Sequence, residues 1–311
     1  MILASYNIHF AIGLDGRHDL DRIADNVRVA DIVCFQEVGQ HWRRNDFADQ
    51  AERLAAYLGY HAVFGAAFDV DASYRDASGN LVNRRRRFGN MVASRWPIRS
   101  TRTEPLPKPP VPAIFDLHRC LVEAVVETPF GDLRVYSVHL SHTSQHRRLV
   151  QIARLLDFVR RAPTEGSAWD HLRLDEDWTE GWETPTLPWP AILAGDLNCV
   201  ANSPEFAELL RPTGAVGETE SDADMMLYDA WALAGNPRSE GISLAGRKPG
   251  YRIDHVLVSG SLCAMVRRSW IERDGGASDH FPMFAELDLG LPLHALRKLS
   301  ENSAREPPKR T

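Results

Sequence analysis

The sequence predicts a mixed α/β protein. Short runs of β-branched and aromatic residues recur along the whole chain, and segments with an apolar helical face separate some of them. A tight turn signal at 129–132 joins two of the runs as a hairpin. Hairpins mixed with crossover connections imply mixed sheets that pack together inside, with helices covering their outer faces.

Each predicted element follows from local pattern and turn chemistry. Asp19 precedes an apolar helical stripe as a cap, and Ser203 with Pro204 marks another helix start. Strands are expected at 2–8, 32–37, 60–68, 90–95, 120–128, 133–140, 191–198, 253–259 and 284–289. Helices are expected at 19–30, 46–58, 144–161 and 203–210.

Composition bounds the class of protein without naming it. A chain of 311 residues with 44% hydrophobic and 25% charged residues is typical of a globular enzyme, in one large domain or two ordinary ones. The net charge of -6 argues against a general nucleic-acid coat, although a local basic groove stays open. A cluster of metal-binding carboxylates would contribute to such a net negative charge, so the charge is compatible with a metal-dependent hydrolase.

Cysteine usage and hydropathy favour a cytoplasmic location. The four cysteines are far apart without ligand-like spacing, so free buried thiols are expected. Residues 1–10 lack the basic region and cleavage site of a signal peptide. No apolar run approaches the roughly 20 residues of a membrane span, so no integral membrane association is expected.

Polar residues stand where several apolar runs stop. Asn7, Glu37 and His139 end three predicted strands, and Asp196 with Asn198 ends a fourth in the segment GDLN. Residues at strand ends project together into a ligand-binding region in open α/β folds. A buried strand ending in Gly-Asp-x-Asn has little structural need for two polar side chains, so this segment is the most specific signal.

The residue types suit metal-assisted hydrolysis of a phosphate ester. Glu37, Asp196 and Asp279 offer the hard oxygen ligands that Mg²⁺ or Mn²⁺ takes. His280 would contact phosphoryl oxygens or exchange a proton, oriented by the carboxylate of Asp254. Taken singly, Asn7 could be a turn residue, Asp254 an exposed acid and Ser278-Asp279 a turn cap.

At this point the chain resembles the endonuclease/exonuclease/phosphatase family. The matching segments are YNIH at 6–9, QE at 36–37, GNMVASRWPI at 89–98, VHL at 138–140, GDLN at 195–198, RIDHVLVS at 252–259 and SDH at 278–280. The resemblance implies a four-layer α-β-β-α sandwich with two packed mixed sheets. It also implies one catalytic domain over 1–290, followed by a flexible basic tail at 291–311.

The resemblance implies a role for each matched residue. Metal binding falls chiefly to Glu37, with Asn7 and Asp279 at the same ion, while Asp196 positions or activates the attacking water. The remaining catalytic candidates are Asn198 and His139, which would contact the phosphate, and the pair Asp254 and His280. Secondary substrate-binding candidates at less specific positions are Asn90 and Arg119.

Departures from the family's branches leave the substrate open. Abasic-site endonucleases usually carry an acid where this chain has His9 and a tyrosine where it has His139. Inositol polyphosphate 5-phosphatases carry other residues after GDxN than Cys199 and Val200. Both branches are therefore disfavoured, and the resemblance is to the heterogeneous bacterial-type metal-dependent hydrolases that open with YNIH.

Two polar insertions differ in their predicted position. Residues 69–88 should emerge on the active face, where Arg84, Arg85, Arg86 and Arg87 could hold an anionic substrate or simply be solvated. The acidic stretch 162–190, with four tryptophans, should lie at the opposite end of the strands, packed over a sheet or forming a partner surface.

Three functions remain in competition. The leading prediction is a Mg²⁺- or Mn²⁺-dependent phosphoesterase that cleaves a phosphodiester or a phosphomonoester. The second is a DNA endonuclease or repair nuclease, for which no clear set of base-stacking aromatic residues is evident in the sequence. The third is a catalytically silent binding module, disfavoured because competent residues occupy every matched catalytic position.

Overall fold

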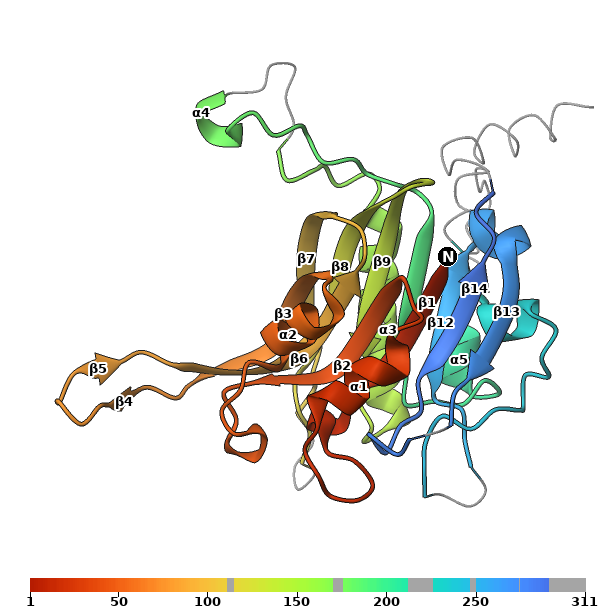
Figure 1. The fold of residues 1–311 in the computed structure, drawn as a ribbon. Coiled ribbons are helices and arrows are strands. Elements are labelled where there is room, and N and C mark those ends of the chain that lie inside the picture. Colours follow the sequence, from red (N-terminus) through yellow and green to blue (C-terminus); the bar gives the residue numbers. More distant parts are fainter. Residues whose placement is uncertain (111–114, 170–175, 212–225, 247–249, 274, 291–311) are drawn as a thin grey trace, which may run out of the picture.

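Two six-stranded sheets packed face to face form the centre of the molecule, with helices on both outer sides (Figure 1). The computed structural model describes residues 1–110, 115–169, 176–211, 226–246, 250–273 and 275–290. The predicted four-layer α-β-β-α sandwich is therefore confirmed, whereas the predicted tail at 291–311 falls outside the described residues.

The first sheet has the strand order β13-β14-β1-β2-β6-β3. Within it β1 and β2 are parallel and the other neighbours are antiparallel. The bounds are β1 Ile2–Asn7, β2 Ile32–Gln40, β3 His61–Asp71, β6 Arg85–Ser94, β13 Val266–Ile271 and β14 Met283–Leu287.

The second sheet has the order β11-β12-β10-β9-β8-β7. Here β9 and β10 are parallel, and the remaining pairs are antiparallel. The bounds are β7 Ile98–Leu106, β8 Arg119–Thr128, β9 Gly131–His139, β10 Ala191–Asp196, β11 Leu227–Asp229 and β12 Asp254–Ser259.

Helices seal the outer face of each sheet with their apolar stripes. The helices α1 (Leu20–Val27) and α2 (Gln50–Leu58) pack on the first sheet, and α3 (Gln145–Arg161) with α5 (Pro204–Leu209) packs on the second. Asp19 caps α1 by accepting from the backbone amides of Asp21 and Arg22, as its sequence position predicts.

The strands missed by sequence reasoning are edge or near-terminal elements. β7 alternates exposed and half-buried residues, and β13 carries two exposed arginines, so neither has the apolar run that marks a central strand. The short β11 and the one-turn helices α4 (Glu176–Thr179) and α7 (Ala230–Leu233) also escaped prediction. The three-residue turns at His9–Ala11 and Arg43–Asn45 and the turn Gly260–Met265 are 3₁₀ helices.

Residues 69–88 form a projecting ribbon rather than an irregular loop. β3 and β6 continue their pairing out to Asp71 and Arg85, and a small hairpin of β4 (Tyr74–Arg75) and β5 (Leu81–Val82) closes the tip. Figure 1 shows this ribbon reaching away from the sandwich on the side where β2 ends. The predicted placement on the active face is consistent with this position.

The described parts of the stretch 162–190, residues 162–169 and 176–190, lie at the other end of the strands, as predicted (Figure 1). Its last residues run beside the start of β9, where the Arg134 amide donates to the carbonyl of Pro190. Packing over the sheet is wrong for two of its tryptophans, because Trp178 is 86% and Trp182 64% exposed, whereas Trp189 packs on the α3 side.

The prediction of free thiols is confirmed. All four cysteines are free, and Cys34, Cys120 and Cys199 are buried. Among the described residues no helix is both long and apolar enough to cross a membrane.

Candidate functional site

The candidate site lies where the layer between the two sheets reaches one end of the strands. In β1 the residues at every second position face the other sheet, and this row ends in Asn7. The corresponding rows of β9, β10 and β12 contain His139, Asp196 and Asp254. Strand alternation alone therefore gathers four polar side chains at the end of the inter-sheet core.

Glu37 joins them only because β2 is irregular at that point. Regular alternation would place Glu37 with Val33 and Phe35, which face the helices. The pairing register of β2 shifts between Phe35 and Val38, and Glu37 adopts a left-handed φ of 59°. A bulge re-aims a side chain in this way, and backbone strain of this kind gathers at functional sites.

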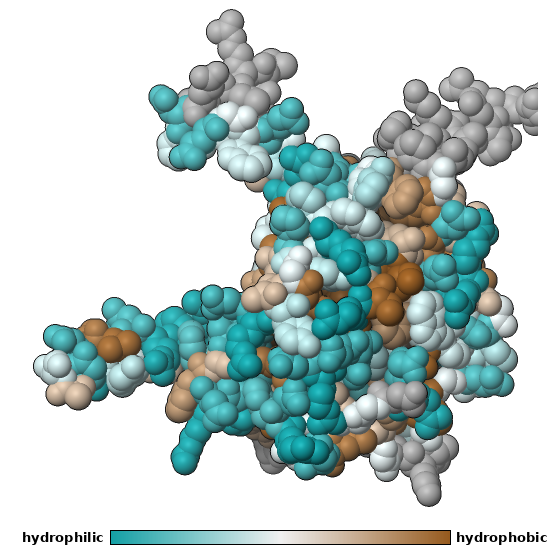
Figure 2. Space-filling view, viewed as in Figure 1, coloured by the Kyte–Doolittle hydropathy of each residue, from teal (hydrophilic) through white to brown (hydrophobic). Residues whose placement is uncertain are grey.

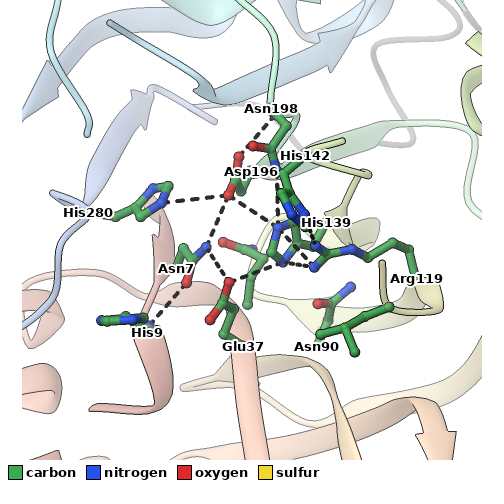
Figure 3. Close-up of polar contacts among 12 residues, drawn as sticks. Asn7, His9, Glu37, Asn90, Arg119, His139, His142, Asp196, Asn198 and His280 are labelled. Carbon is green, nitrogen blue, oxygen red and sulfur yellow. Dashed lines mark hydrogen bonds and ion pairs between the residues drawn. The ribbon is translucent and has the colours of Figure 1, made fainter. Parts of the chain in front are cut away.

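The carboxylate of Asp196 occupies the centre of the site (Figure 3). Its Oδ2 accepts from Asn7 Nδ2 at 3.0 Å and lies 3.3 Å from His139 Nε2, and its Oδ1 accepts from the Asn198 amide at 2.9 Å. Burial disfavours the charged carboxylate, while His280 favours it, and the balance raises the pKa of Asp196 to about 7. Such a carboxyl can exchange protons near neutral pH.

His280 forms a buried pair with Asp254. The imidazole Nδ1 lies 2.8 Å from Asp254 Oδ2, and Nε2 points toward Asp196 Oδ2 at 3.7 Å. Burial favours the neutral ring, but the two carboxylates outweigh it and raise the pKa of His280 to about 10. The imidazole is therefore a cation at neutral pH, aimed at the central carboxylate.

His139 has the opposite electrostatic environment. Complete burial and the neighbouring Arg119 guanidinium hold the pKa of His139 well below its usual range. Arg119 Nη1 lies 2.8 Å from His139 Nδ1, its Nη2 lies 3.2 Å from His142 Nδ1, and Asn198 Nδ2 lies 3.1 Å from His139 Nε2. His139 is therefore a neutral imidazole with the side-chain nitrogens of Arg119 and Asn198 next to its ring.

The segment Ser278–His280 is fixed to the end of β1. Ser278 Oγ donates to the Asn7 carbonyl at 2.8 Å and accepts from the His280 amide at 3.1 Å. Asp279 is half-exposed at the rim, with Oδ1 3.7 Å from His9 Nδ1. Asn7 Oδ1 accepts from the His9 amide at 3.0 Å, so the amide nitrogen of Asn7, rather than its oxygen, faces Glu37 at 3.3 Å.

Among the described residues, one cluster of ligand atoms and one separate carboxylate could hold a metal ion. The ligand atoms of Asp196, Asp254 and His280 lie within 4.8 Å of one another. Glu37 Oε1 is the other candidate, because it is largely buried and has no arginine or lysine within 4.0 Å among the described residues, and its nearest ring nitrogen, His139 Nδ1, is 3.9 Å away. A protonated imidazole has no lone pair for a metal, which counts against His280 as a ligand.

The secondary candidates are placed differently from one another. Arg119 reaches the catalytic side chains, whereas the Asn90 amide donates to the backbone carbonyls of Cys120 at 2.9 Å and Ser137 at 3.3 Å and ties the sheets together. The four ribbon arginines divide into Arg85 and Arg87, which pair with acids, and Arg84 and Arg86, which form no ion pair with any residue that the structure describes.

Sequence reasoning missed residues in the connection from β2 to α2. Arg44 is close enough to Glu37 for the carboxylate to act on its pKa, which burial lowers. Its guanidinium lies 3.7 Å from the centre of the Phe10 ring and 4.4 Å from that of Trp42. The only signal in the sequence was two adjacent arginines soon after Glu37, which a solvated turn would also carry.

Comparison with known proteins connects this geometry to a family. Residues 4–280 match the model of the Endonuclease/Exonuclease/phosphatase family. No curated protein matches the chain.

Solved structures share the fold at low sequence identity. An endonuclease/exonuclease/phosphatase from Beutenbergia cavernae is 24% identical, with a TM-score of 0.59 over 92% of this chain and 71% of that one. A mannosyl-6-phosphatase from Bacteroides thetaiotaomicron is 18% identical, with a TM-score of 0.58 over 93% and 99%. ANGEL2, a 2',3'-cyclic phosphatase, is 13% identical, with a TM-score of 0.58 over 93% and 95%.

Proposed function

We propose, because the chain belongs to the endonuclease/exonuclease/phosphatase family, that it hydrolyses a phosphoric ester with the help of a divalent metal ion. The observation that carries the proposal is the placement of Asp196, whose buried carboxylate lies between the neutral His139 and the cationic His280. A carboxyl with a pKa of about 7 beside a fixed cation suits proton transfer from an attacking water.

Substrate phosphate would be bound by the donors around Asp196. His280 and Arg119 carry positive charge, and Asn198 Nδ2 is held by the Leu140 carbonyl at 3.0 Å. His280 and Arg119 are buried and Asn198 is partly buried, and all three are held by hydrogen bonds before substrate arrives, so they can stabilise the charge that develops on phosphoryl oxygens. Asp254 acts by positioning His280 and keeping it protonated.

Glu37 is the proposed anchor of the metal ion, Mg²⁺ or Mn²⁺, with Asp279 and Asn7 as further ligands. The donor set of hard oxygens fits either ion, and among the described residues no arginine or lysine lies within 4.0 Å of the Glu37 carboxylate. Asn7 would have to present its oxygen in place of its nitrogen. A bound divalent ion polarises a phosphoryl oxygen and offsets the negative charge of the ester.

A catalytically silent binding module does not fit this arrangement. Binding alone would not need a carboxylate buried without an arginine or lysine partner, which costs several kcal/mol. Asp196 has no such partner within the described residues, and its neighbours are histidine and asparagine side chains.

Three further predictions from the sequence stay proposals. One catalytic domain is proposed over 1–290 with a basic tail at 291–311, and a cytoplasmic location is proposed. The substrate is proposed to be a phosphate ester, either a phosphodiester or a phosphomonoester, and nucleic acid is among the candidates.

The proposal is tested with bis-p-nitrophenyl phosphate as a general diester. We expect turnover with Mg²⁺ or Mn²⁺, none after EDTA, and a loss of about 10²- to 10⁴-fold in kcat for Asp196→Ala, the range that a proton-transfer group supplies. The matched control is Asp288→Ala, an exposed acid directly after the end of β14, which pairs with the start of β1 away from Asn7, and this variant should keep full activity. Absence of metal-dependent turnover on this diester and on a panel of nucleic acids, phospholipids and sugar phosphates would disprove the proposal.

A further inference from the structure

The four arginines of the ribbon lie on two opposite faces. In the pairing of β3 with β6, Asp69 stands opposite Arg87 and Asp71 opposite Arg85, so these residues share one face. Arg85 Nε is 2.8 Å from Asp69 Oδ1, and Arg87 Nε is 3.5 Å from Asp69 Oδ2. On this face the charges are compensated.

The other face keeps its positive charge. Arg86 stands opposite Val70 in the register, and Arg84, which directly precedes β6, lines the same hollow as Arg86. Neither arginine forms an ion pair with a described residue, and the same is true of Arg44 on the neighbouring connection. In a chain of net charge -6, three guanidinium groups without an ion pair to a described residue form a local basic strip.

Each of these three arginines lies over an aromatic ring. Arg44 covers Phe10 at 3.7 Å and Trp42 at 4.4 Å, and Arg86 lies over the same Trp42 at 5.2 Å. Further out, Arg84 lies over Tyr74 at 4.7 Å and Phe47 at 5.8 Å. We call this set the arginine ladder: Arg44, Arg84 and Arg86 with Phe10, Trp42, Phe47 and Tyr74.

A rigid base holds the inner part of the ladder. The Trp42 indole donates to the Arg87 carbonyl at 2.7 Å, which fixes the ring against β6. Beneath it, the rings of Phe10, Phe88, Phe68 and Trp42 contact one another in series, with centroids 5.4 to 6.0 Å apart. The stacking planes are therefore in place before any ligand binds.

The ladder begins at the catalytic residues and ends on the ribbon. Phe10 is three residues from Asn7, and Arg44 interacts electrostatically with Glu37. At the outer end, Phe47, Ala72, Tyr74, Arg84 and Arg86 line an open hollow of about 330 Å³. Figure 2 shows the ribbon standing clear of the body with a largely hydrophilic surface. A long ligand could thus occupy the ladder while one of its phosphates reaches the site.

We propose that the arginine ladder binds single-stranded nucleic acid and feeds its phosphodiester backbone into the site, an inference that rests on the proposed function. Guanidinium groups pair with backbone phosphates, and bases stack on exposed rings and on guanidinium planes. Phe47 and Tyr74 are each exposed by more than 40%, so their rings are accessible. A duplex would hide the base faces that such planes bind.

The two faces of the ribbon supply a matched pair of variants. Arg84→Gln with Arg86→Gln removes two charges from the ladder, and Arg85→Gln with Arg87→Gln removes two from the paired face of the same strand. Binding of a fluorescein-labelled oligothymidylate is measured by anisotropy in EDTA, so that no turnover interferes. The same strand annealed to its complement and inorganic polyphosphate serve as competitors.

We expect the ladder variant to weaken binding about tenfold and to lower the salt slope by about 1.4, the value for two phosphate contacts on a single strand. The variant of the paired face should change the Kd less than about threefold, because those charges already have partners. Duplex and polyphosphate should compete less well than the free strand.

Equal losses in both variants, equal competition by polyphosphate, or no binding by the unaltered protein would overturn the inference. Those results would leave the proposed hydrolysis untouched if the diester assay shows metal-dependent turnover. Conversely, the expected binding pattern without turnover on any ester would refute the proposed function and keep the ladder as a nucleic-acid surface.

Discussion

The charged side chains of the catalytic site and those of the ribbon differ in burial. At the site, Asp196, Asp254 and His280 are buried, and burial together with neighbouring charges shifts the pKa values of Asp196 and His280. On the ribbon the charges remain solvated, and only their face on a strand decides whether they are neutralised. The difference suggests that chemistry depends on burial, whereas substrate choice depends on the alternation of one exposed strand.

The largest effect should follow from breaking the buried pair of Asp254 and His280. Asp254→Asn removes the charge that keeps His280 protonated, so we expect kcat to fall by about 10²-fold or more. The variant should also be less stable by about 3 kcal/mol at pH 6, the scale for loss of one partner of a buried pair. Thermal unfolding and diester turnover measure the two effects.

The pH dependence separates this electrostatic effect from a loss of packing. The pKa of His280 is raised from 6.5 to about 10 in the folded protein, so the pair stabilises fully below pH 6.5 and the contribution disappears as pH rises toward 10. The stability difference between the variant and the unaltered protein should therefore shrink over that window. A difference that stays constant from pH 6 to 10 would contradict the assigned charge state.

A smaller effect is expected when the proposed metal anchor is altered. With Mg²⁺ at about 100 times its Kd, binding should stabilise the unaltered protein by about 2.7 kcal/mol, and Glu37→Gln should lose most of that gain. Glu52→Gln, an exposed acid in α2, is the control. If Glu37→Gln keeps the full Mg²⁺-dependent shift in Tm, the ion is held by Asp196, Asp254 and His280 instead.

The sequence predicted what depends on regular structure. Polar residues at the ends of apolar runs singled out His139 and Asp196, which lie 3.3 Å apart in the structure, and the resemblance matched Asp254 with His280, which form a buried pair. Their catalytic roles stay predictions. Glu37 was expected at the end of a strand, but β2 continues to Gln40, and the orientation of the Glu37 side chain depends on a bulge and a left-handed φ that no local sequence pattern indicates.

The charge pattern of the ribbon was less predictable from the sequence, because it depends on which residues the pairing of β3 with β6 brings opposite one another. The run Arg84–Arg87 appears uniform in sequence, and only the register with Asp69 and Asp71 divides it. Likewise Arg44 and Trp42 belong to a turn whose partner, Phe10, is distant in sequence and contributes through tertiary contact alone. Strand pairing and ring stacking between such distant segments are decided by the fold as a whole.

The smallest effect is expected from a change to an acid of the ribbon, which tests whether the ribbon has one charge-paired face and one unpaired face. Asp69→Asn removes the exposed carboxylate that neutralises Arg85 and Arg87, so it should cost less than about 1 kcal/mol of stability. Binding of oligothymidylate should tighten by no more than about threefold, because the freed charges face away from the arginine ladder. Asp25→Asn, an exposed acid of α1 paired with Arg28, is the control for the change in net charge. Tightening of tenfold or more in Asp69→Asn alone would mean that Arg85 and Arg87 form the binding face, and the assignment of the two faces would have to be reversed.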